Sequence, residues 1–404
     1  MSGRQAVRRT GRVTAAGLGL ALLAGGCGSV GGRAAAPGPA VPAALSLSTS
    51  MQGAGATWVT IPMGAASGAD QFWQLFVLPA GGSQWSLQTP PDIATNGAIV
   101  LAAPDAAGTG GTGGASGKTL VAGVRPSLNL SFSPITSTAD LGRSWATQPP
   151  QSGLADVPDA LAAAPGSGKP GGPLIALGQD GTVSVTTGAG GDWRPLITER
   201  ALAASPAARG CGLTGLSAVA YTPAGTPLLA GICGKDGAVG VFGETSGTWH
   251  LAGPALPASL GGQSVRVLRL SRAGGQDVAV LEAGAAPALS LVTAWTGDGG
   301  QHWALSPVLR TGGAAVSASF GDGGVGVVLA GNRAETTSGP GSSWRRLPAL
   351  PAARTATLAL PATGPTEALA ADAGTLTAWR LAGSAGAWVK AQTIKVPIQY
   401  GSSG

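Results

Sequence analysis

The chain is poor in the side chains that most often carry chemistry. Its 404 residues include two His, two Tyr and three Cys, and only 10% of them are charged. His250 and His302 have no neighbours at the spacing of metal ligands. Two His and no reactive free thiol give little support to Ser/His or Cys/His catalysis. The composition therefore predicts no metal, no cofactor and no enzyme activity, although a carboxylate pair assembled by the fold stays open.

The sequence also lacks an apolar run long enough to span a bilayer, which needs about 20 residues. Residues 13–24 are apolar, follow four Arg, and suit the core of a signal peptide. They lead into Ala24-Gly25-Gly26-Cys27, which resembles a bacterial lipobox with Ala24 in the place that Leu usually holds. We expect a lipoprotein signal peptide over 1–26, a lipid on Cys27 and a flexible tether over 27–43. An ordinary signal peptide with an incidental Cys is the alternative, and the choice between Sec and twin-arginine export stays open.

The basic net charge of +6 comes mainly from this N-terminal segment. Removal of the residues before Cys27 takes away four Arg and no acidic residue, which leaves 20 basic against 18 acidic residues. A nearly neutral chain has no electrostatic footprint for nucleic acid. We therefore expect an exported monomer, anchored by lipid to the outer face of the bacterial cytoplasmic membrane, with no nucleic acid partner.

The other two cysteines, Cys211 and Cys233, form an even pair in a chain that we expect to be exported. The segment between them is typical of a hairpin, with strands over 213–221 and 226–233 around a Thr-Pro-Ala-Gly turn. Such a hairpin places the two cysteines opposite each other, and exported proteins form disulfides. We expect a disulfide, with two buried free thiols as the alternative.

One eight-residue pattern recurs along the chain. Residues 138–145 and 296–303 both read T-x-D-x-G-x-x-W, while 186–193 and 337–344 carry Gly in place of the Asp. A short Asp side chain accepts bonds from nearby backbone N–H groups in a tight turn, and the Gly two positions later takes a positive φ. The Trp then begins a strand and supplies a large apolar surface. The predicted structural residues of the two Asp copies are Thr138, Asp140, Gly142, Trp145, Thr296, Asp298, Gly300 and Trp303.

This pattern resembles the Asp-box, or BNR repeat, of sialidase-like β-propellers. The resemblance covers four repeats and places the pattern in the turn between the third and fourth strands of a blade. Trp85, Trp249 and Trp388 keep the Trp of the pattern and lose the rest. We therefore expect an all-β fold, a β-propeller over residues 44–404 with seven four-stranded blades, six or eight being the alternatives. The segment 58–62 is an inner or a closing strand of the first blade, and the tail 393–400 is a candidate for ring closure.

The resemblance to sialidases implies a test for catalysis. Sialidases hold the substrate carboxylate with three Arg and use a Tyr nucleophile assisted by a Glu. This chain has no Arg between Arg33 and Arg125, so the first blade lacks one of the three. Tyr400 lies in the tail, and we interpret Tyr221 as structural, at a strand end beside a Pro-Gly turn. No residue can be assigned to a sialidase active site.

A binding module fits these residues better. We predict a non-catalytic, membrane-anchored scaffold for a protein or glycan, with a divergent sialidase-like glycoside hydrolase and a sensing or accessory subunit of a cell-envelope complex as alternatives. Loops that join second and third strands, together with inter-blade loops such as 195–210, share one face of a propeller, and binding concentrates on such loops. For Asp180 and Asp236, turn chemistry alone is the alternative. The candidate binding face carries Arg125, Asp180, Asp236, Glu282, Arg333 and Asp372.

Overall fold

The computed structural model describes residues 47–64, 71–91, 98–103, 119–125, 135–147, 158–165, 172–187, 193–273, 275–383 and 386–397. All of them belong to one unit of the chain, Val41–Gly404. The predicted signal peptide, Cys27 and the tether over 27–43 lie outside the described residues.

The described strands pair antiparallel in seven successive sets of four, each in chain order. The short runs of apolar residues between Gly- and Pro-containing turns favour this local pairing. The first three sets are β1 (Ser48–Gly53), β2 (Ala56–Gly64), β3 (Gln71–Pro79) and β4 (Ser86–Leu87); β5 (Ala98–Ala102), β6 (Leu120–Arg125), β7 (Ile135–Thr138) and β8 (Ala146–Thr147); β9 (Pro158–Ala163), β10 (Leu174–Gly178), β11 (Thr182–Thr186) and β12 (Arg194–Thr198).

The C-terminal half of the chain continues the same arrangement. Its first two sets are β13 (Leu213–Tyr221), β14 (Pro227–Cys233), β15 (Gly240–Thr245) and β16 (Thr248–Leu251); β17 (Val265–Ala273), β18 (Gln276–Ala283), β19 (Ser290–Thr296) and β20 (Ala304–Leu305), with β21 (Leu309–Arg310) also paired to β19. The last two are β22 (Ala315–Gly321), β23 (Gly324–Leu329), β24 (Arg333–Thr337) and β25 (Arg345–Arg346); β26 (Thr355–Ala359), β27 (Glu367–Asp372), β28 (Thr375–Leu381) and β29 (Trp388–Lys395).

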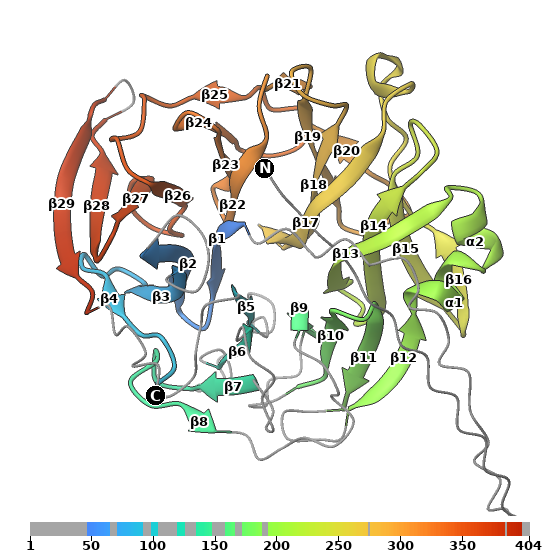
Figure 1. Ribbon diagram of the computed structural model, residues 1–404, viewed down its shortest axis with the longest axis horizontal. Helices are drawn as coiled ribbons and strands as arrows, with labels where there is room; N and C mark the ends of the chain where they lie inside the picture. The colour runs from blue at the N-terminus through green and yellow to red at the C-terminus, as the bar shows by residue number, and fades with distance from the viewer. Residues whose placement is uncertain are drawn as a thin grey trace, which may run out of the picture. The chain divides into compact units, whose positions relative to one another are not determined.

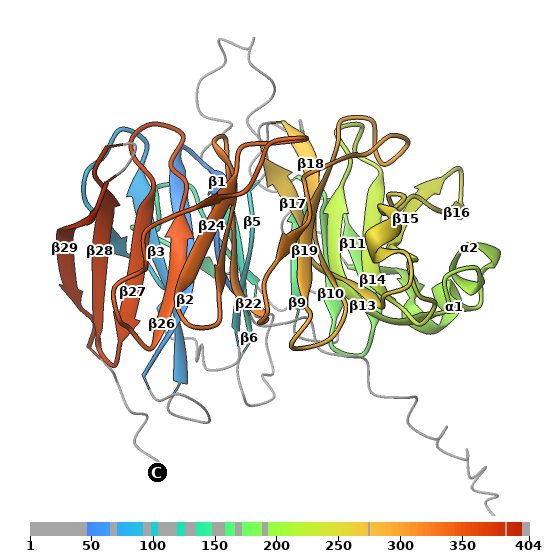
Figure 2. The same cartoon turned by 90° about the horizontal axis from the view of Figure 1, so that it is seen from above.

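The sets stand around a common centre, and the chain passes from one to the next in sequence order (Figure 1). The side view shows their strands standing beside one another in the same layer (Figure 2). Apolar clusters fill the space between neighbouring sets; for example, Ala218 and Val241 of one set pack with Val267 and Ala279 of the next. The fold is an all-β β-propeller, as the repeats predicted.

The ring closes without a shared sheet between the two ends of the chain. β1 pairs in parallel with β22, with Ser48 and Thr49 opposite Ser317 and Ala318. β26 packs against both of these strands, and the Thr357 hydroxyl lies 2.5 Å from Ser317 Oγ. The segment 58–62 belongs to β2, the second strand of its set. Residues 393–395 of the tail, a candidate for ring closure, complete β29 beside β28, and Ile394 packs in the cluster that joins the last set to the first.

The seven Trp predicted at the third turn of each set all lie there, directly before or within the fourth strand. Trp145 and Trp303 precede β8 and β20, and Trp388 opens β29. The segment 195–210, expected to be a loop, contains the end of β12 and the short helices α1 (Glu199–Ala203) and α2 (Pro206–Arg209). Thr198 and Ser205 cap the two helices, which explains why this segment folds locally. A single 3-10 turn, η1 (Ala258–Leu260), precedes β17.

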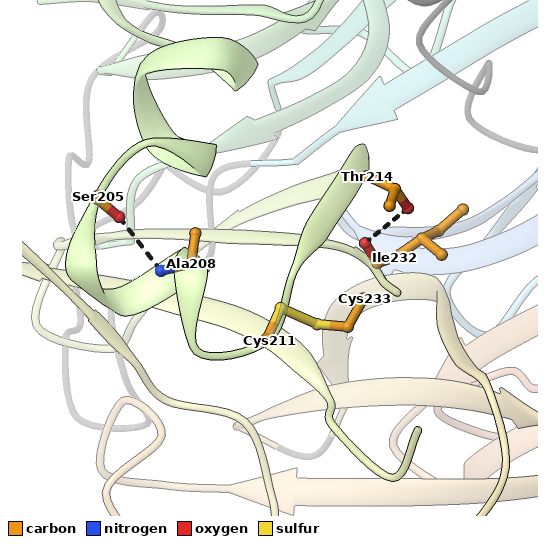
Figure 3. Close-up of a disulfide and its surroundings, with 6 residues drawn as sticks. All are labelled: Ser205, Ala208, Cys211, Thr214, Ile232 and Cys233. Atoms are coloured by element: carbon orange, nitrogen blue, oxygen red, sulfur yellow. Dashed lines mark hydrogen bonds between the residues drawn. A yellow bond between two sulfur atoms is a disulfide. The ribbon is translucent and has the colours of Figure 1, made fainter. Parts of the chain in front are cut away.

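The predicted hairpin and disulfide both form. β13 and β14 pair antiparallel with Leu213 opposite Cys233, and Cys211 is bonded to Cys233 with 5.2 Å between their Cα atoms. Figure 3 shows the bond beside helix α2, where Ser205 accepts from the Ala208 N–H, and beside the bond from Thr214 to the Ile232 carbonyl. The disulfide therefore attaches the helical segment to the end of β14. No helix in the described part of the chain is long and apolar enough to cross a membrane.

Candidate functional site

A cavity of about 700 Å³ lies at the centre of the propeller. Its wall is formed by the innermost strands of the first six sets, β1, β5, β9, β13, β17 and β22. No residue of β26 contributes, because the parallel pair of β1 and β22 lies in front of it. A volume of this size falls within the range of roughly 300–1,000 Å³ that ligand pockets occupy.

The wall exposes strand edges as well as side chains. Consecutive residues line the cavity over 99–103, 159–163, 217–221 and 269–273. If only one face of a strand met the cavity, every second residue would line it, because side chains alternate between faces. Among the described strands, β5 and β9 pair only with their own second strands, so their other edges face the centre, where the backbone groups within 99–103 and 160–163 have no strand partner.

Two opposite charges meet within this apolar wall. Arg269 on β17 donates from Nη1 to the Leu268 carbonyl and from Nη2 to the Leu47 carbonyl, both at 3.3 Å. Desolvation lowers the pKa of Arg269 to about 10, and the nearby carboxylate of Asp159 on β9 opposes this shift. At neutral pH the guanidinium therefore stays charged, with Asp159 as its counter-charge.

A second Arg lies nearer one end of the cavity. Nε of Arg272 is 3.6 Å from Asp277 Oδ1, and its Nη2 donates to the Gly275 carbonyl at 3.1 Å. Asp277 is fully buried, and desolvation raises its pKa to about 7 while Arg272 lowers it. This carboxyl is therefore a group inside the fold whose charge changes near neutral pH.

Tyr221 ends β13 and lines the same cavity, although only 6% of the residue is exposed. Burial raises the pKa of its phenol to about 12, so the hydroxyl stays protonated at neutral pH. A protonated phenol donates and accepts hydrogen bonds but is a poor nucleophile. The residue that we interpreted as structural thus packs in the core and also faces the central cavity.

The cavity lies toward the face that carries the turns between first and second strands. Pro223, Gly275 and Asp322 of these turns contribute to its lining. In an antiparallel set of four, the turn between third and fourth strands lies on this same face. The recurring Thr-Asp turns therefore lie on the same face as this end of the cavity, farther from the centre of the propeller.

The predicted binding residues lie on the opposite face, at the second-to-third connections, and none of those whose side chains the structure describes lines the cavity. Asp180 accepts from the Thr182 N–H and hydroxyl, both at 2.8 Å, which is the turn chemistry considered as its alternative. Glu282 is buried and accepts from Arg266 Nε at 2.7 Å. Arg333 donates to the Thr311 carbonyl at 3.0 Å. Asp236 and Asp372 are exposed, and Arg125 ends β6.

The two Asp turns have the geometry that their residues predicted. Asp298 Oδ1 accepts from the His302 N–H at 3.0 Å and from the Thr296 hydroxyl at 2.8 Å. Asp140 accepts from the Ser144 hydroxyl at 2.6 Å, from the Ser144 N–H at 2.9 Å and from the Thr138 hydroxyl. These bonds lower the pKa of Asp140 to about 2 and hold the pKa of Asp298 well below its usual range. Gly142 and Gly300 have φ of 83° and 92°, and Trp303 Nε1 donates to the Ala252 carbonyl of the preceding set.

Sequence reasoning missed Asp159, Arg269 and Arg272. The signal was three Arg within the strand-like run 265–273, since Arg is rarely placed in a buried strand without a partner. Nothing in the sequence placed Asp159 beside Arg269. In the described part of the chain, no group of three or more His, Cys, Asp or Glu could hold a metal ion.

No family model matches the chain, and no curated protein matches it. Solved β-propellers do resemble it. YCF48 from Cyanidioschyzon merolae is 14% identical over 82% of this chain and 95% of its own, with a TM-score of 0.47. The six-bladed fucose-recognising lectin of Aleuria aurantia is 13% identical over 77% and 99%, with a TM-score of 0.38. An ulvanlyase, a polysaccharide lyase, is 14% identical over 76% and 82%, with a TM-score of 0.42. Likenesses this distant concern the fold alone.

Proposed function

We propose that this chain is a non-catalytic, seven-bladed binding propeller that holds part of a protein or glycan in its central cavity. The cavity is the observation that carries the proposal. It joins a mostly apolar wall to a few fixed polar groups, Arg269, Asp159 and Tyr221. Ligand sites in proteins usually have this composition.

The same residues argue against hydrolysis. A Tyr nucleophile needs a lowered pKa or an adjacent base, and burial raises the pKa of Tyr221 to about 12. Among the described residues that line the cavity, Tyr221 is the only Tyr, and none is a Glu. Arg269 already donates two bonds to backbone carbonyls and has Asp159 as its counter-charge, so it is poorly placed to hold a substrate carboxylate.

A glycoside hydrolase is the second candidate, because two carboxylates, Asp159 and Asp322, line one cavity. Most glycosidases use a pair of carboxylates, one as acid and the other as base or nucleophile. If this candidate holds, aryl glycosides are cleaved at enzyme-like rates and Asp159→Asn together with Asp322→Asn abolishes the cleavage. Our proposal predicts no turnover by either protein.

The protein acts outside the cytoplasm in this proposal, anchored through Cys27 to the outer face of the bacterial membrane, where it serves alone or as an accessory subunit of an envelope complex. The disulfide between Cys211 and Cys233 supports export, because disulfides persist in oxidising compartments. Cys27→Ala is expected to move the full chain from the membrane fraction to the soluble exported fraction. Unchanged fractionation of the variant contradicts the anchor and leaves the binding proposal standing.

Filling the cavity tests the binding proposal. Ala162 lines the cavity and is partly exposed to it, whereas Ala304 is exposed on β20, an outermost strand. We expect a ligand found on a glycan array or in a displayed peptide library to bind the wild type and Ala304→Phe, but not Ala162→Phe. Equal binding by all three proteins, or no ligand in either screen, contradicts the proposal.

A further inference from the structure

We propose that the ligand of the central cavity is an extended peptide segment of about five residues, which pairs through its backbone, along one of its own edges, with the inner edge of β5 or of β9. This inference rests on the proposed binding function and names the class of its ligand. It starts from the edges of β5 and β9, whose backbone groups face the cavity over residues 99–103 and 160–163. An extended peptide satisfies such a row of alternating donors and acceptors by adding a strand.

The centre of the fold already contains one such pairing. β1 lies against the inner edge of β22 in parallel, with Ser48, Thr49 and Ser50 opposite Ser317, Ala318 and Ser319. Here one innermost strand uses its inner edge to bind another extended segment. Strand pairing at the axis is therefore compatible with the spacing of this propeller, and the inner edges of β5 and β9 offer the same groups.

The dimensions of the cavity fit one strand. Each lining run holds five residues, and at roughly 3.3 Å per residue a run is about 16 Å long. The volume of about 700 Å³ offers room for an extended segment of this length.

The wall also selects among peptides. Its partly exposed side chains are small at several positions, Ala103, Ala160, Ala162 and Ala163, and small side chains let a backbone approach closely. The charged residues of the wall balance, with Asp159 and Asp322 against Arg269 and Arg272. We therefore expect a segment without net charge.

A glycan fits this wall less well. Sugar rings pack their C–H faces against aromatic faces, which carry partial negative charge. The aromatic residues of the lining are Tyr221 and Phe320, which are only 6% and 1% exposed, so neither presents a free face. We therefore expect a peptide rather than a glycan, and glycan binding is the alternative that the experiment must exclude.

The decisive experiment uses peptides from a displayed library of seven-residue sequences and a glycan array as probes. Peptides that bind the wild type are then resynthesised with a single N-methyl group at each position in turn. Strand pairing predicts that methylation at alternate positions weakens binding at least tenfold, because only alternate N–H groups face the paired edge. Methylation of the intervening positions is expected to change the affinity by less than threefold.

Two cavity variants and one control complete the test. Ala162→Phe and Ser271→Phe, which fill the cavity from β9 and β17, are expected to lose the peptide, whereas Ala304→Phe keeps it. If Ala162→Phe does not fold, Ser271→Phe still tests the cavity. Circular dichroism shows whether each variant is folded. A glycan that binds the wild type and is lost in the cavity variants overturns the peptide class and upholds the binding function. The inference is overturned if the peptides bind all variants equally, or if the effect of N-methylation does not alternate along the peptide. If neither screen yields a ligand, the proposed binding function is overturned as well.

Discussion

The indole Nε1 of Trp85 donates to Glu367 Oε2 at 2.6 Å and joins the first set of strands to the last. Both side chains are buried, and Glu367 also accepts from Arg380 Nε at 2.7 Å. Gln392 adds two bonds to the backbone of Trp85, at 2.7 and 2.9 Å. The last set shares no strand with the first, and in the described part of the chain one isolated backbone bridge, between Gly64 and Ala373, joins them. Side-chain contacts such as these therefore stabilise the junction.

Trp85→Phe keeps most of the apolar surface and removes the N–H donor at this junction. Loss of a bond to a buried charged group costs about 1–3 kcal/mol, so the free energy of unfolding should fall by that amount in urea titrations. Trp388→Phe is the matched control, because its Nε1 donates to the Pro348 carbonyl at an exposed site. Equal losses in the two variants would show that the Glu367 contact has no special part in closing the ring.

Asp277 makes stability depend on pH. Its folded pKa of about 7 lies above the unfolded value of about 3.8, so the folded state binds more protons between these values and loses stability as pH rises. Burial likewise raises the pKa of Glu199, which adds to the same trend, whereas the low pKa values of Asp140 and Asp298 act only below this window. The loss of folding stability caused by the ionised Asp277 is fully present above about pH 7.

Asp277→Asn should remove most of this dependence. Each pKa unit corresponds to about 1.4 kcal/mol, so we expect the variant to gain a few kcal/mol relative to wild type between pH 4.5 and 8 in denaturant titrations. Asp236→Asn, on an exposed turn, serves as control and should follow the wild type. A wild-type stability that rises across this range, or a variant with an unchanged slope, contradicts the assignment.

The turn of Asp298 and Trp303 offers a ranking of effects. Trp303→Ala removes a partly buried indole that also bonds the neighbouring set, and should cost about 3 kcal/mol, at the low end for truncated aromatics. Asp298→Ala removes bonds to an exposed turn and should lower the urea midpoint by less. Asp298→Asn keeps an acceptor oxygen and should lie between Asp298→Ala and wild type. If Asp298→Ala proved the more damaging change, the turn would have a role beyond folding.

Much of this fold follows from local sequence. The Asp, Gly and Trp of the turns act within eight residues, so their pattern predicted the turns, the fourth strands and the propeller. The Cys211–Cys233 hairpin is equally local, with a separation of 22 positions between the cysteines.

The site could not be predicted in the same way, because it depends on contacts between distant strands. Pairing of Ser48 with Ser317 excludes β26 from the centre and leaves six strands around the cavity. The proximity of Asp159 to Arg269 also arises from the closed ring, and neither residue belongs to a motif. The sequence analysis looked for binding residues in loops and selected charged residues such as Asp180 and Glu282. Asp180 bonds to Thr182 and Glu282 to Arg266, each within its own set of strands.

The disulfide should protect both of its cysteines from alkylation until a reductant is added, which mass spectrometry of the native protein can follow. By the chain-entropy estimate, a loop of this length gives the bond a contribution of roughly 3 kcal/mol. Cys211→Ala with Cys233→Ala should therefore lower the free energy of unfolding by about that amount. Ala204→Ser, at the exposed end of α1 in the same segment, is the control. Labelling of both thiols without reductant would falsify the pairing.

The wild-type protein should release no sialic acid from standard sialosides, and Tyr221→Phe should leave that result unchanged. Transfer to a Tyr nucleophile requires loss of the phenolic proton, and burial that raises the pKa of Tyr221 to about 12 opposes this loss. Removal of the hydroxyl should instead weaken a ligand that binds the cavity, by roughly fivefold for one neutral hydrogen bond of about 1 kcal/mol. The control is Tyr221→Leu, which also removes the ring and should lower stability. Release of sialic acid by the wild type that disappears in Tyr221→Phe would make the cavity an active site and the scaffold proposal wrong.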